Sequence, residues 1–343
     1  MKTFSFNGHQ YPITGLLFNK DNDLLFSSSK DQFITLWSTI QLERVGTYKH
    51  GAAVYTMDID KNSKYLISGD SIGKVYLWEA CNGRLIKNLV ENENDITSIR
   101  SVNLDYENNL LLIASGGRTA ASTNKIDIYK FEDLLKENNP QCLKSILIPN
   151  KDKITKARWC DLGDSILATS ETGYIYKFNY NSGELEKQAK IHNKDIMDLD
   201  ISPKEELILT ASKDGQAKVI DPDTLNELSV LSPKKPERNI NACRFSPLLS
   251  SNDEKSVKYH AFLAGGQESK DVTTTATKKG GFEILIYNYM YEYELGSLSG
   301  HFSPVNALAI TSDGEILASG YEESSIRLYK LNNEEYNNLE KNK

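Results

Sequence analysis

The sequence predicts an all-β fold made of repeated antiparallel units, and two patterns carry this prediction. Short apolar runs alternate with polar residues at a period of two and end at tight turns, as in residues 305–310 before Asp313-Gly314. In four places a histidine precedes an aromatic or aliphatic residue by 28 positions. The four pairs are His9 and Trp37, His50 and Trp78, His192 and Ile220, and His301 and Tyr329. A unit of about 30 residues cannot bury both of its faces, so several copies must pack together.

A small hydroxyl residue stands ten positions before the end of each of these units, at Ser27, Ser68, Thr210 and Ser319. The pattern resembles that of the WD-repeat family, whose units carry Gly-His near the start and Trp-Asp at the end. The resemblance covers nearly the whole chain and implies a β-propeller, in which each unit forms one blade of a ring. As a guide to function it is weak, because propellers serve many unrelated roles.

Seven units are recognised along the chain, which predicts a seven-bladed WD-repeat β-propeller. They span residues 8–37, 50–78, 92–129, 150–178, 192–220, 236–287 and 300–329. In the first unit, strands are predicted at residues 13–18, 24–28 and 33–37. The second unit has the same layout, but Ile72 stands where the first unit has Asp31. The third unit lacks the histidine and carries extra residues at 116–125, and the charged segment 131–141 after it is expected to form one or two helical turns.

The later units depart from the regular pattern at identifiable places. The fourth unit has Asn150 in the position of the histidine, and Trp159 in its first strand is expected to lie in the core. The fifth unit is regular and ends at Asp221, which keeps the Asp of the Trp-Asp pair. The sixth unit is 23 residues longer than a regular one, with insertions at 246–260 and 267–281.

The two ends of the chain are expected to meet in the last blade. Residues 2–6 alternate ahead of the first Gly-His pair, and we expect them to pair with the strand at residues 326–329. The N-terminal strand would then close the ring and remove an exposed sheet edge. A single propeller is predicted over residues 1–331. Residues 332–343 are polar and are expected to form a frayed or weakly helical C-terminal tail.

The repeated histidines are interpreted as structural, because catalysis or metal binding needs one cluster and not four copies in different units. In the WD-repeat pattern the histidine bridges a buried hydroxyl and a turn carboxylate, and the hydroxyl accepts the indole N–H of the tryptophan. Such partners are needed because an unsatisfied buried polar group costs about 1–3 kcal/mol. The assigned residues are His9, Ser27, Asp31 and Trp37; His50, Ser68 and Trp78; His192, Thr210 and Asp214; and His301 and Ser319, with Glu323 and Tyr329 at the Asp and Trp positions.

Composition narrows the class of function. The net charge of −7 argues against a broad electrostatic contact with nucleic acid, although it leaves room for a local basic patch. We expect no direct sequence-specific binding of nucleic acid. The four cysteines have no zinc-ligand spacing and are expected to be free and buried; they are Cys81, Cys142, Cys160 and Cys243.

The sequence offers no constellation typical of an enzyme. We recognise no catalytic cluster, metal site, phosphate loop or cofactor site, so a catalytic role is not expected. The N-terminus lacks the apolar stretch of a signal peptide, and no run is long enough to span a bilayer. These features favour a cytoplasmic protein that does not contact membranes.

A more specific resemblance lies in the sixth unit, where GGQESKDVTTT occupies residues 265–275 and Gly-Phe-Glu follows at 281–283. Together with residues 301–306, this segment resembles the family of subunit I of eukaryotic translation initiation factor 3. The turns at 70–73 and 321–323 depart from that family's pattern. The resemblance implies a non-catalytic scaffold that binds subunits B and G of the factor. It also implies a role in pre-initiation complex assembly and scanning on the small ribosomal subunit, and we expect a monomer when the chain is alone.

Two surfaces are candidates for partner contacts. The insertions in the third and sixth units fall in turns on the face of the Gly-His loops, where exposed polar loops often bind partners. The candidate residues there are Gln267, Glu268, Lys270 and Asp271. Alternatively, these insertions pack over the channel of the propeller. The acidic turns at Asp214 and Asp221 form the second candidate surface, suited to a basic helix of a partner.

Other functions remain open on the sequence alone. The alternative to an initiation factor subunit is another WD-repeat adaptor, acting in signalling or in association with the ribosome. An enzyme built on a propeller is a third class, and it would need converging carboxylates or a metal at the mouth of the channel.

Overall fold

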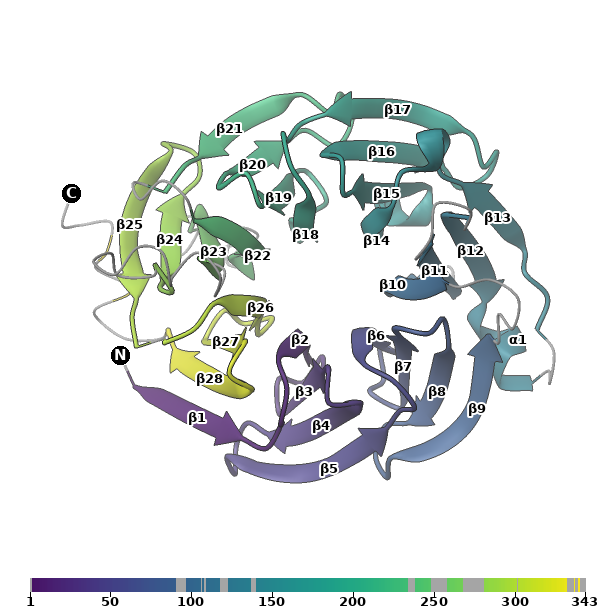
Figure 1. Ribbon diagram of the computed structural model, residues 1–343, viewed down its shortest axis with the longest axis horizontal. Helices are drawn as coiled ribbons and strands as arrows, with labels where there is room; N and C mark the ends of the chain where they lie inside the picture. The colour runs from purple at the N-terminus through teal and green to yellow at the C-terminus, as the bar shows by residue number, and fades with distance from the viewer. Residues whose placement is uncertain are drawn as a thin grey trace.

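The structure, a computed structural model, is a ring of seven four-stranded antiparallel sheets around a central channel (Figure 1). The prediction of a seven-bladed propeller is thereby confirmed. The structure describes residues 2–90, 97–105, 107, 109–117, 123–136, 140–233, 238–247, 258–267, 281–300, 302–331, 336 and 339. Among these residues no helix is long and apolar enough to cross a membrane.

Each blade runs from an innermost strand at the channel to an outermost strand at the rim. Blade 1 holds β2 (Ile13–Phe18), β3 (Leu24–Ser29), β4 (Phe33–Ser38) and β5 (Glu43–Lys49). Blade 2 holds β6 (Val54–Ile59), β7 (Tyr65–Asp70), β8 (Val75–Glu79) and β9 (Arg84–Val90). Blade 3 holds β10 (Thr97–Asp105), β11 (Leu110–Gly117), β12 (Lys125–Lys130) and β13 (Lys144–Leu147).

The remaining blades follow the same order. Blade 4 holds β14 (Ile154–Cys160), β15 (Ser165–Ser170), β16 (Tyr174–Asn179) and β17 (Leu185–Lys190). Blade 5 holds β18 (Ile196–Ile201), β19 (Ile208–Ser212), β20 (Ala217–Ile220) and β21 (Glu227–Leu231). Blade 6 holds β22 (Asn239–Phe245), β23 (His260–Gly266), β24 (Ile284–Asn288) and β25 (Tyr293–Leu298). Blade 7 holds β26 (Val305–Ile310), β27 (Ile316–Tyr321), β28 (Ser325–Lys330) and β1 (Thr3–Asn7).

Each blade has four strands, whereas the sequence pattern predicts three per unit. The strand that the pattern does not predict is the outermost one. In β17 five of the six side chains are exposed, and in β5 four of the seven are exposed. A rim strand has solvent beyond its edge, so it needs little apolar alternation. The pattern that reveals the inner strands is therefore weak in these segments.

The N-terminal strand closes the ring as the sequence predicts. β1 pairs antiparallel with β28, with Phe4 opposite Leu328 and Phe6 opposite Ile326. Phe6 is buried and stacks on Trp37, with ring centroids 4.8 Å apart and planes inclined by 13°. The first and last blades are thus joined both by backbone hydrogen bonds and by aromatic packing.

Three local expectations can be compared with the described residues. The charged segment after β12 begins with a short helix, α1 (Phe131–Lys136), which buries Phe131 and Leu134. Trp159 is buried in the apolar cluster between blades 3 and 4, and its indole N–H donates to Asn103 O at 3.1 Å. Most residues of the three insertions, 118–122, 248–257 and 268–280, lie outside the described residues.

The described part of the predicted C-terminal tail packs on the propeller. Tyr336 is 2% exposed, and its ring stacks on Phe262 with centroids 6.3 Å apart. Its hydroxyl is 2.9 Å from Nδ1 of His260, and Lys258 Nζ lies 4.0 Å from the ring centroid. Leu339 contacts the same apolar cluster. The tail is therefore anchored by an aromatic side chain within its polar sequence.

All four cysteines are free, as expected, but only Cys160 and Cys243 are buried. Cys81 and Cys142 are exposed, so the expectation of four buried thiols is wrong for these two. They lie before the rim strands β9 and β13, where the chain faces solvent on the outside of the ring.

Candidate functional site

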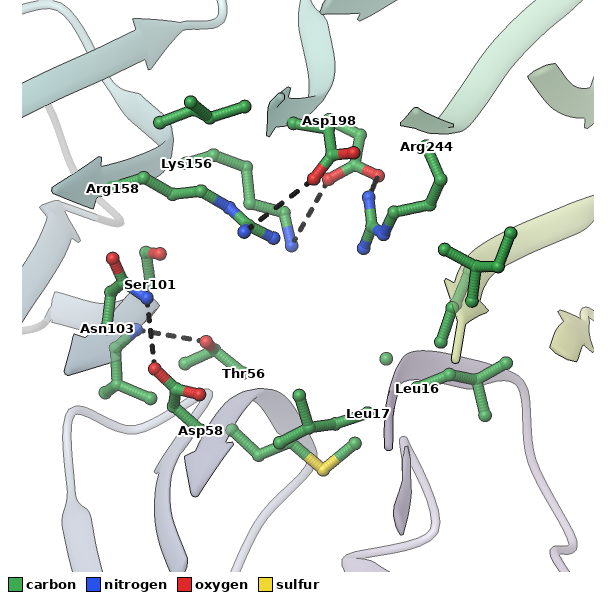
Figure 2. Close-up of a pocket in the computed structure, with 18 of the residues that line it drawn as sticks. Leu16, Leu17, Thr56, Asp58, Ser101, Asn103, Lys156, Arg158, Asp198 and Arg244 are labelled. Atoms are coloured by element: carbon green, nitrogen blue, oxygen red, sulfur yellow. Dashed lines mark hydrogen bonds and ion pairs between the residues drawn. The ribbon is translucent and has the colours of Figure 1, made fainter. Parts of the chain in front are cut away.

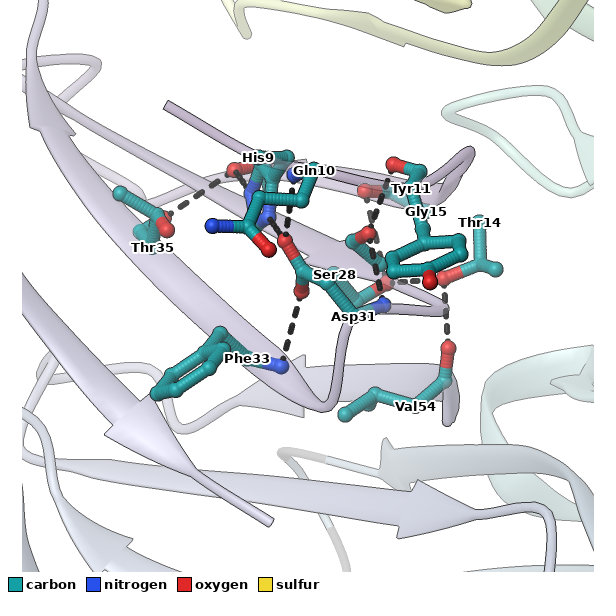
Figure 3. Close-up of polar contacts among 12 residues, drawn as sticks. His9, Gln10, Tyr11, Thr14, Gly15, Ser28, Asp31, Phe33, Thr35 and Val54 are labelled. Carbon is teal, nitrogen blue, oxygen red and sulfur yellow. Dashed lines mark hydrogen bonds and ion pairs between the residues drawn. The ribbon is translucent and has the colours of Figure 1, made fainter. Parts of the chain in front are cut away.

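The blade 1 histidine lies in a complete hydrogen-bonded tetrad, of which Figure 3 shows His9 and Asp31. His9 Nδ1 donates to Asp31 Oδ2 at 2.8 Å, and Nε2 is 2.7 Å from Ser27 Oγ. Trp37 Nε1 donates to the same hydroxyl at 2.8 Å. Burial alone would raise the pKa of Asp31, but the hydrogen bonds from His9 and from the Gln10 N–H hold that pKa below its usual value. The four residues tie the loop before β2 to the β3–β4 turn.

Blade 5 repeats this arrangement without the tryptophan. His192 Nδ1 donates to Asp214 Oδ2 at 2.9 Å, and Nε2 is 2.9 Å from Thr210 Oγ1. Burial opposes ionisation of Asp214, but the hydrogen bonds from His192 and from the Asn193 N–H lower its pKa to about 2. Ile220, at the position of the tryptophan, is buried and offers no donor to Thr210.

Blade 2 keeps the histidine and the tryptophan but lacks the carboxylate. His50 Nε2 is 2.9 Å from Ser68 Oγ, and Trp78 Nε1 donates to that hydroxyl at 2.8 Å. Within the described residues, His50 Nδ1 is buried without a hydrogen-bond partner. Burial lowers the pKa of His50 to about 3, so the imidazole is neutral in the folded protein. Ile72 occupies the turn position that Asp31 fills in blade 1.

Blades 7 and 4 use different polar contacts in the same region. In blade 7, His301 lies outside the described residues. Ser319 Oγ is 2.8 Å from the Tyr321 hydroxyl, and that hydroxyl is 3.2 Å from the Tyr329 hydroxyl. In blade 4 the carboxylate of Asp152 accepts from Tyr176 at 2.6 Å and from Thr172 at 2.5 Å. The sequence pattern did not identify Tyr321 or Asp152, because neither occupies a position of the repeat motif.

The described histidines of the repeat thus lie in separate blades and each serves its own turn. Among the described residues no group of three or more His, Cys, Asp or Glu side chains could hold a metal ion. At these sites hydrogen bonds satisfy buried donors and acceptors. These bonds hold the loops on one face of the ring in place.

Asp214 and Asp221, predicted as one acidic surface, lie at opposite ends of β20 and therefore on opposite faces of the ring. The four extended residues of β20 lie between them and span roughly 13 Å. The Asp214 carboxylate accepts hydrogen bonds from His192, Asn193 and Gln216. Asp221 Oδ1 caps the β20–β21 turn by accepting the N–H groups of Asp223 and Thr224. Asp221 is the more accessible of the two carboxylates.

The other predicted contact residues cluster after β23. Gln267 follows the last residue of that strand and is half-buried. Glu268, Lys270 and Asp271 lie outside the described residues. β23 and β24 are the second and third strands of blade 6, as β3 and β4 are of blade 1, so β23 ends on the face of the ring on which the β3–β4 turn lies.

Three exposed apolar side chains, which we call the blade 5–6 seam, lie in the outermost strand of blade 5 and in the β24–β25 turn of blade 6. They are Leu228 on β21 and Met290 and Tyr291 in the β24–β25 turn, which are 55%, 58% and 74% exposed. The two blades meet here, since Val230 N donates to Glu292 Oε1 at 3.1 Å.

The charged wall of the central channel is a second feature that the sequence analysis missed. The channel has a volume of about 1450 Å³, and each innermost strand contributes alternate side chains to its wall (Figure 2). In blade 4 these are Lys156 and Arg158, in blade 5 Asp198 and Asp200, and in blade 6 Arg244. The signal was present in the sequence, because charged residues alternate with buried ones in Ile154–Cys160.

Comparisons with known proteins cover almost the whole chain. The family model EIF3I matches residues 1–341. The chain is 33% identical over 333 residues to eukaryotic translation initiation factor 3 subunit I of Danio rerio, covering 96% of each chain. It is 32% identical over 332 residues to the subunit of the same name from Homo sapiens, again with 96% of each chain covered. The Xenopus tropicalis subunit is 31% identical over 331 residues.

Proposed function

Because the chain belongs to the EIF3I family, that of subunit I of eukaryotic translation initiation factor 3, we propose that it is a non-catalytic scaffold subunit of this factor. The observation that carries the proposal is the family match from end to end, which leaves no room for a separate catalytic domain within residues 1–341. The engagement of His9, His50 and His192 within their own blades supports a structural use of these side chains.

The scaffold would act through protein contacts in the cytoplasm. We assign subunits B and G as its neighbours, and pre-initiation complex assembly and scanning on the small ribosomal subunit as the process that it supports. Alone, the chain would be a monomer, because the pairing of β1 with β28 leaves no gap in the ring.

The blade 5–6 seam is the surface on which we place a neighbouring protein of the factor. Exposed Leu228, Met290 and Tyr291 supply apolar area, and aromatic side chains often dominate the energy of such contacts. Asp221 and Asp223 lie in the neighbouring turn and supply negative charge. An amphipathic helix with a basic face fits this combination, and the acidic turn would select its orientation.

Affinity capture tests the proposal. The tagged full-length chain would be recovered from lysate of its own cells at moderate and at high salt, and the bound proteins identified by mass spectrometry. Recovery of initiation factor subunits, with B and G foremost and the small ribosomal subunit at low salt, is the expected result. Recovery of signalling proteins without any subunit of the factor would favour the alternative, another WD-repeat adaptor.

A pair of matched variants tests the surface. Leu228→Ala with Met290→Ala should reduce capture of subunits B and G by about tenfold, because apolar anchors at an interface carry most of its energy. Val45→Ala with Ile40→Ala is the control, since these exposed residues occupy the corresponding strand and turn positions of blade 1. Equal capture by both variants would remove the blade 5–6 seam from the interface and leave the scaffold proposal standing.

A further inference from the structure

The wall of the central channel is polarised. The inward positions of β26 and β2 hold small or apolar residues, namely Ala307, Ala309, Gly15 and Leu17. The inward positions of β14, β18 and β22 hold three cations and two carboxylates. All the charges of these five strands therefore lie in blades 4 to 6, and Asp58 on β6 adds a carboxylate elsewhere on the channel wall (Figure 2).

The two carboxylates of this side are already engaged with the protein. Asp198 Oδ2 accepts from Arg244 Nη1 at 2.6 Å and from Cys243 N at 3.2 Å. Asp200 Oδ2 accepts from Phe245 N at 2.8 Å. Both carboxylates therefore join the innermost strands of blades 5 and 6, and this structural use explains their presence without any ligand.

Lys156 and Arg158 are not engaged in this way. Lys156 Nζ lies 3.9 Å from Asp198 Oδ1, and Arg158 Nη1 lies 3.8 Å from Asp200 Oδ1. Within the described part of the chain neither side chain has a hydrogen bond. Their side chains are 28% and 34% exposed, and Figure 2 shows their nitrogen atoms turned toward the same open space as those of Arg244.

The cations of this side lie close to one another. Lys156, Arg158 and Arg244 have Asp198 and Asp200 as neighbouring carboxylates, and Asp58 on β6 also acts electrostatically on Arg158. Burial lowers the pKa of Lys156; Asp198 opposes this effect, whereas Arg244 and Arg158 add to it. A bound anion would relieve the repulsion among the cations and return the pKa of Lys156 toward its usual value.

We propose that the central channel binds a small, multiply charged phosphate compound between Lys156, Arg158 and Arg244. A guanidinium pairs with two phosphate oxygens at once, and an ammonium adds a point charge, so this set suits phosphate groups. The channel volume of about 1450 Å³ admits a molecule of several phosphates.

Calorimetric titration of the full-length chain with inorganic triphosphate tests this site. At an ionic strength of about 0.15 M, where surface charges are largely screened, one triphosphate should bind per chain. Lys156→Gln with Arg158→Gln should weaken binding by about tenfold or more, since two charge-assisted contacts are lost.

The control removes the same charges from another place. Arg44→Gln with Lys49→Gln takes one arginine and one lysine from the exposed rim strand β5, and the affinity should stay within about twofold because surface charges beyond a Debye length are screened. Lys156→Arg with Arg158→Lys keeps both charges and should retain binding. Thermal melts of each variant without ligand establish that it is folded before its affinity is compared.

Three results would overturn the proposal. The first is triphosphate binding no tighter than that of sulfate at equal ionic strength. The second is an equal loss of affinity in the channel variant and in the rim control. The third is binding of a hexaglutamate peptide with no binding of triphosphate, which would assign the channel to an acidic peptide.

Discussion

The hydroxyl of Ser27 is the point at which two aromatic side chains of blade 1 are satisfied. It contacts His9 Nε2 at 2.7 Å and accepts from Trp37 Nε1 at 2.8 Å, and it is fully buried. Because both rings carry polar atoms into the core, each depends on this one oxygen. The same hydroxyl position is used in blades 2 and 5, by Ser68 and Thr210.

Replacing Trp37 tests the importance of this contact. Trp37→Ala should lower the free energy of unfolding by about 3–5 kcal/mol, because it empties a large core volume and removes the stacking partner of Phe6. Trp37→Phe keeps the ring but loses the N–H, and should cost about 1–3 kcal/mol. Urea denaturation followed by circular dichroism measures both. A midpoint unchanged in Trp37→Ala would contradict the structural role of the tetrad in blade 1.

Ile72 is the residue that makes blade 2 differ from blades 1 and 5. The neighbouring residue adopts the same left-handed backbone in all three turns, with φ of 75° at Gln32, 88° at Gly73 and 87° at Gly215. An aspartate at position 72 would therefore point at His50 Nδ1 as Asp31 points at His9. Ile72 is exposed, so its replacement does not open a cavity.

Ile72→Asp should change the dependence of stability on pH. In the native chain His50 has a folded-state pKa of about 3, below the unfolded value of about 6.5, so stability is lost as pH falls from 6.5 toward 3. The new carboxylate should raise the folded-state pKa and make the loss between about pH 6.5 and 5 smaller. Unfolding free energies of Ile72→Asp and of Ile72→Ala, measured in that range, provide the comparison. Parallel curves for the two variants would show that the carboxylate does not reach His50.

At the scale of elements, Tyr336 is the more deeply buried of the two described residues in the C-terminal tail, and Leu339 packs against the same apolar cluster. Tyr336 packs against β23 through Phe262 and His260, although the sequence around it is polar. A helical turn or tail with a single buried aromatic gains most of its stability from that residue, since the free energy follows the apolar area removed from water.

Tyr336→Ala should therefore release the segment. We expect a loss of about 3–5 kcal/mol of unfolding free energy, typical of an aromatic side chain deleted from a core. Tyr336→Phe, which loses only the contact with His260 Nδ1, should cost about 1 kcal/mol. Limited proteolysis should cut the Ala variant in its last residues faster than the Phe variant. Equal cleavage and equal stability in both would place Tyr336 outside the folded core.

At the scale of the whole molecule, closure decides whether seven blades form one domain. β1 supplies the rim strand of blade 7 from the opposite end of the chain, with five paired residues. The apolar cluster around Phe6 also includes residues of blades 1 and 7. The cohesion of the ring therefore depends on a contact between the two ends of the sequence.

Deleting residues 2–7 should open this contact. The variant should melt at a lower temperature than the full chain, because Phe6 leaves the core and the β28 edge is exposed. An exposed edge pairs readily with other chains, so a concentration-dependent shift toward dimers is expected in light scattering. Lys2→Ala serves as the control at the exposed end of the segment. A truncated chain that melts like the full one and stays monomeric would mean that closure is dispensable.

The periodic features were predictable from the sequence because their physical cause lies within one unit. His9, Ser27, Asp31 and Trp37 show the spacing that the other copies follow, and the pairing of residues 2–6 with the last blade follows from the need to close a ring. The family resemblance rested on a contiguous segment at residues 265–275 and needed no structure. Blade number, closure and family were therefore determined by the sequence alone.

Contacts between blades were decided only by the tertiary structure. Asp198 accepts a hydrogen bond from Arg244 of the next blade, and Lys156 and Arg158 lie on the same wall of the channel. Asp214 and Asp221 lie on opposite faces of the ring. Each of these relations depends on where the closed ring places the strands. The seam of Leu228 with Met290 and the anchoring of Tyr336 also depend on neighbours in other blades or beyond. A repeat pattern records what each blade needs to fold by itself, whereas the environment of a side chain between blades depends on which units the closed ring brings together.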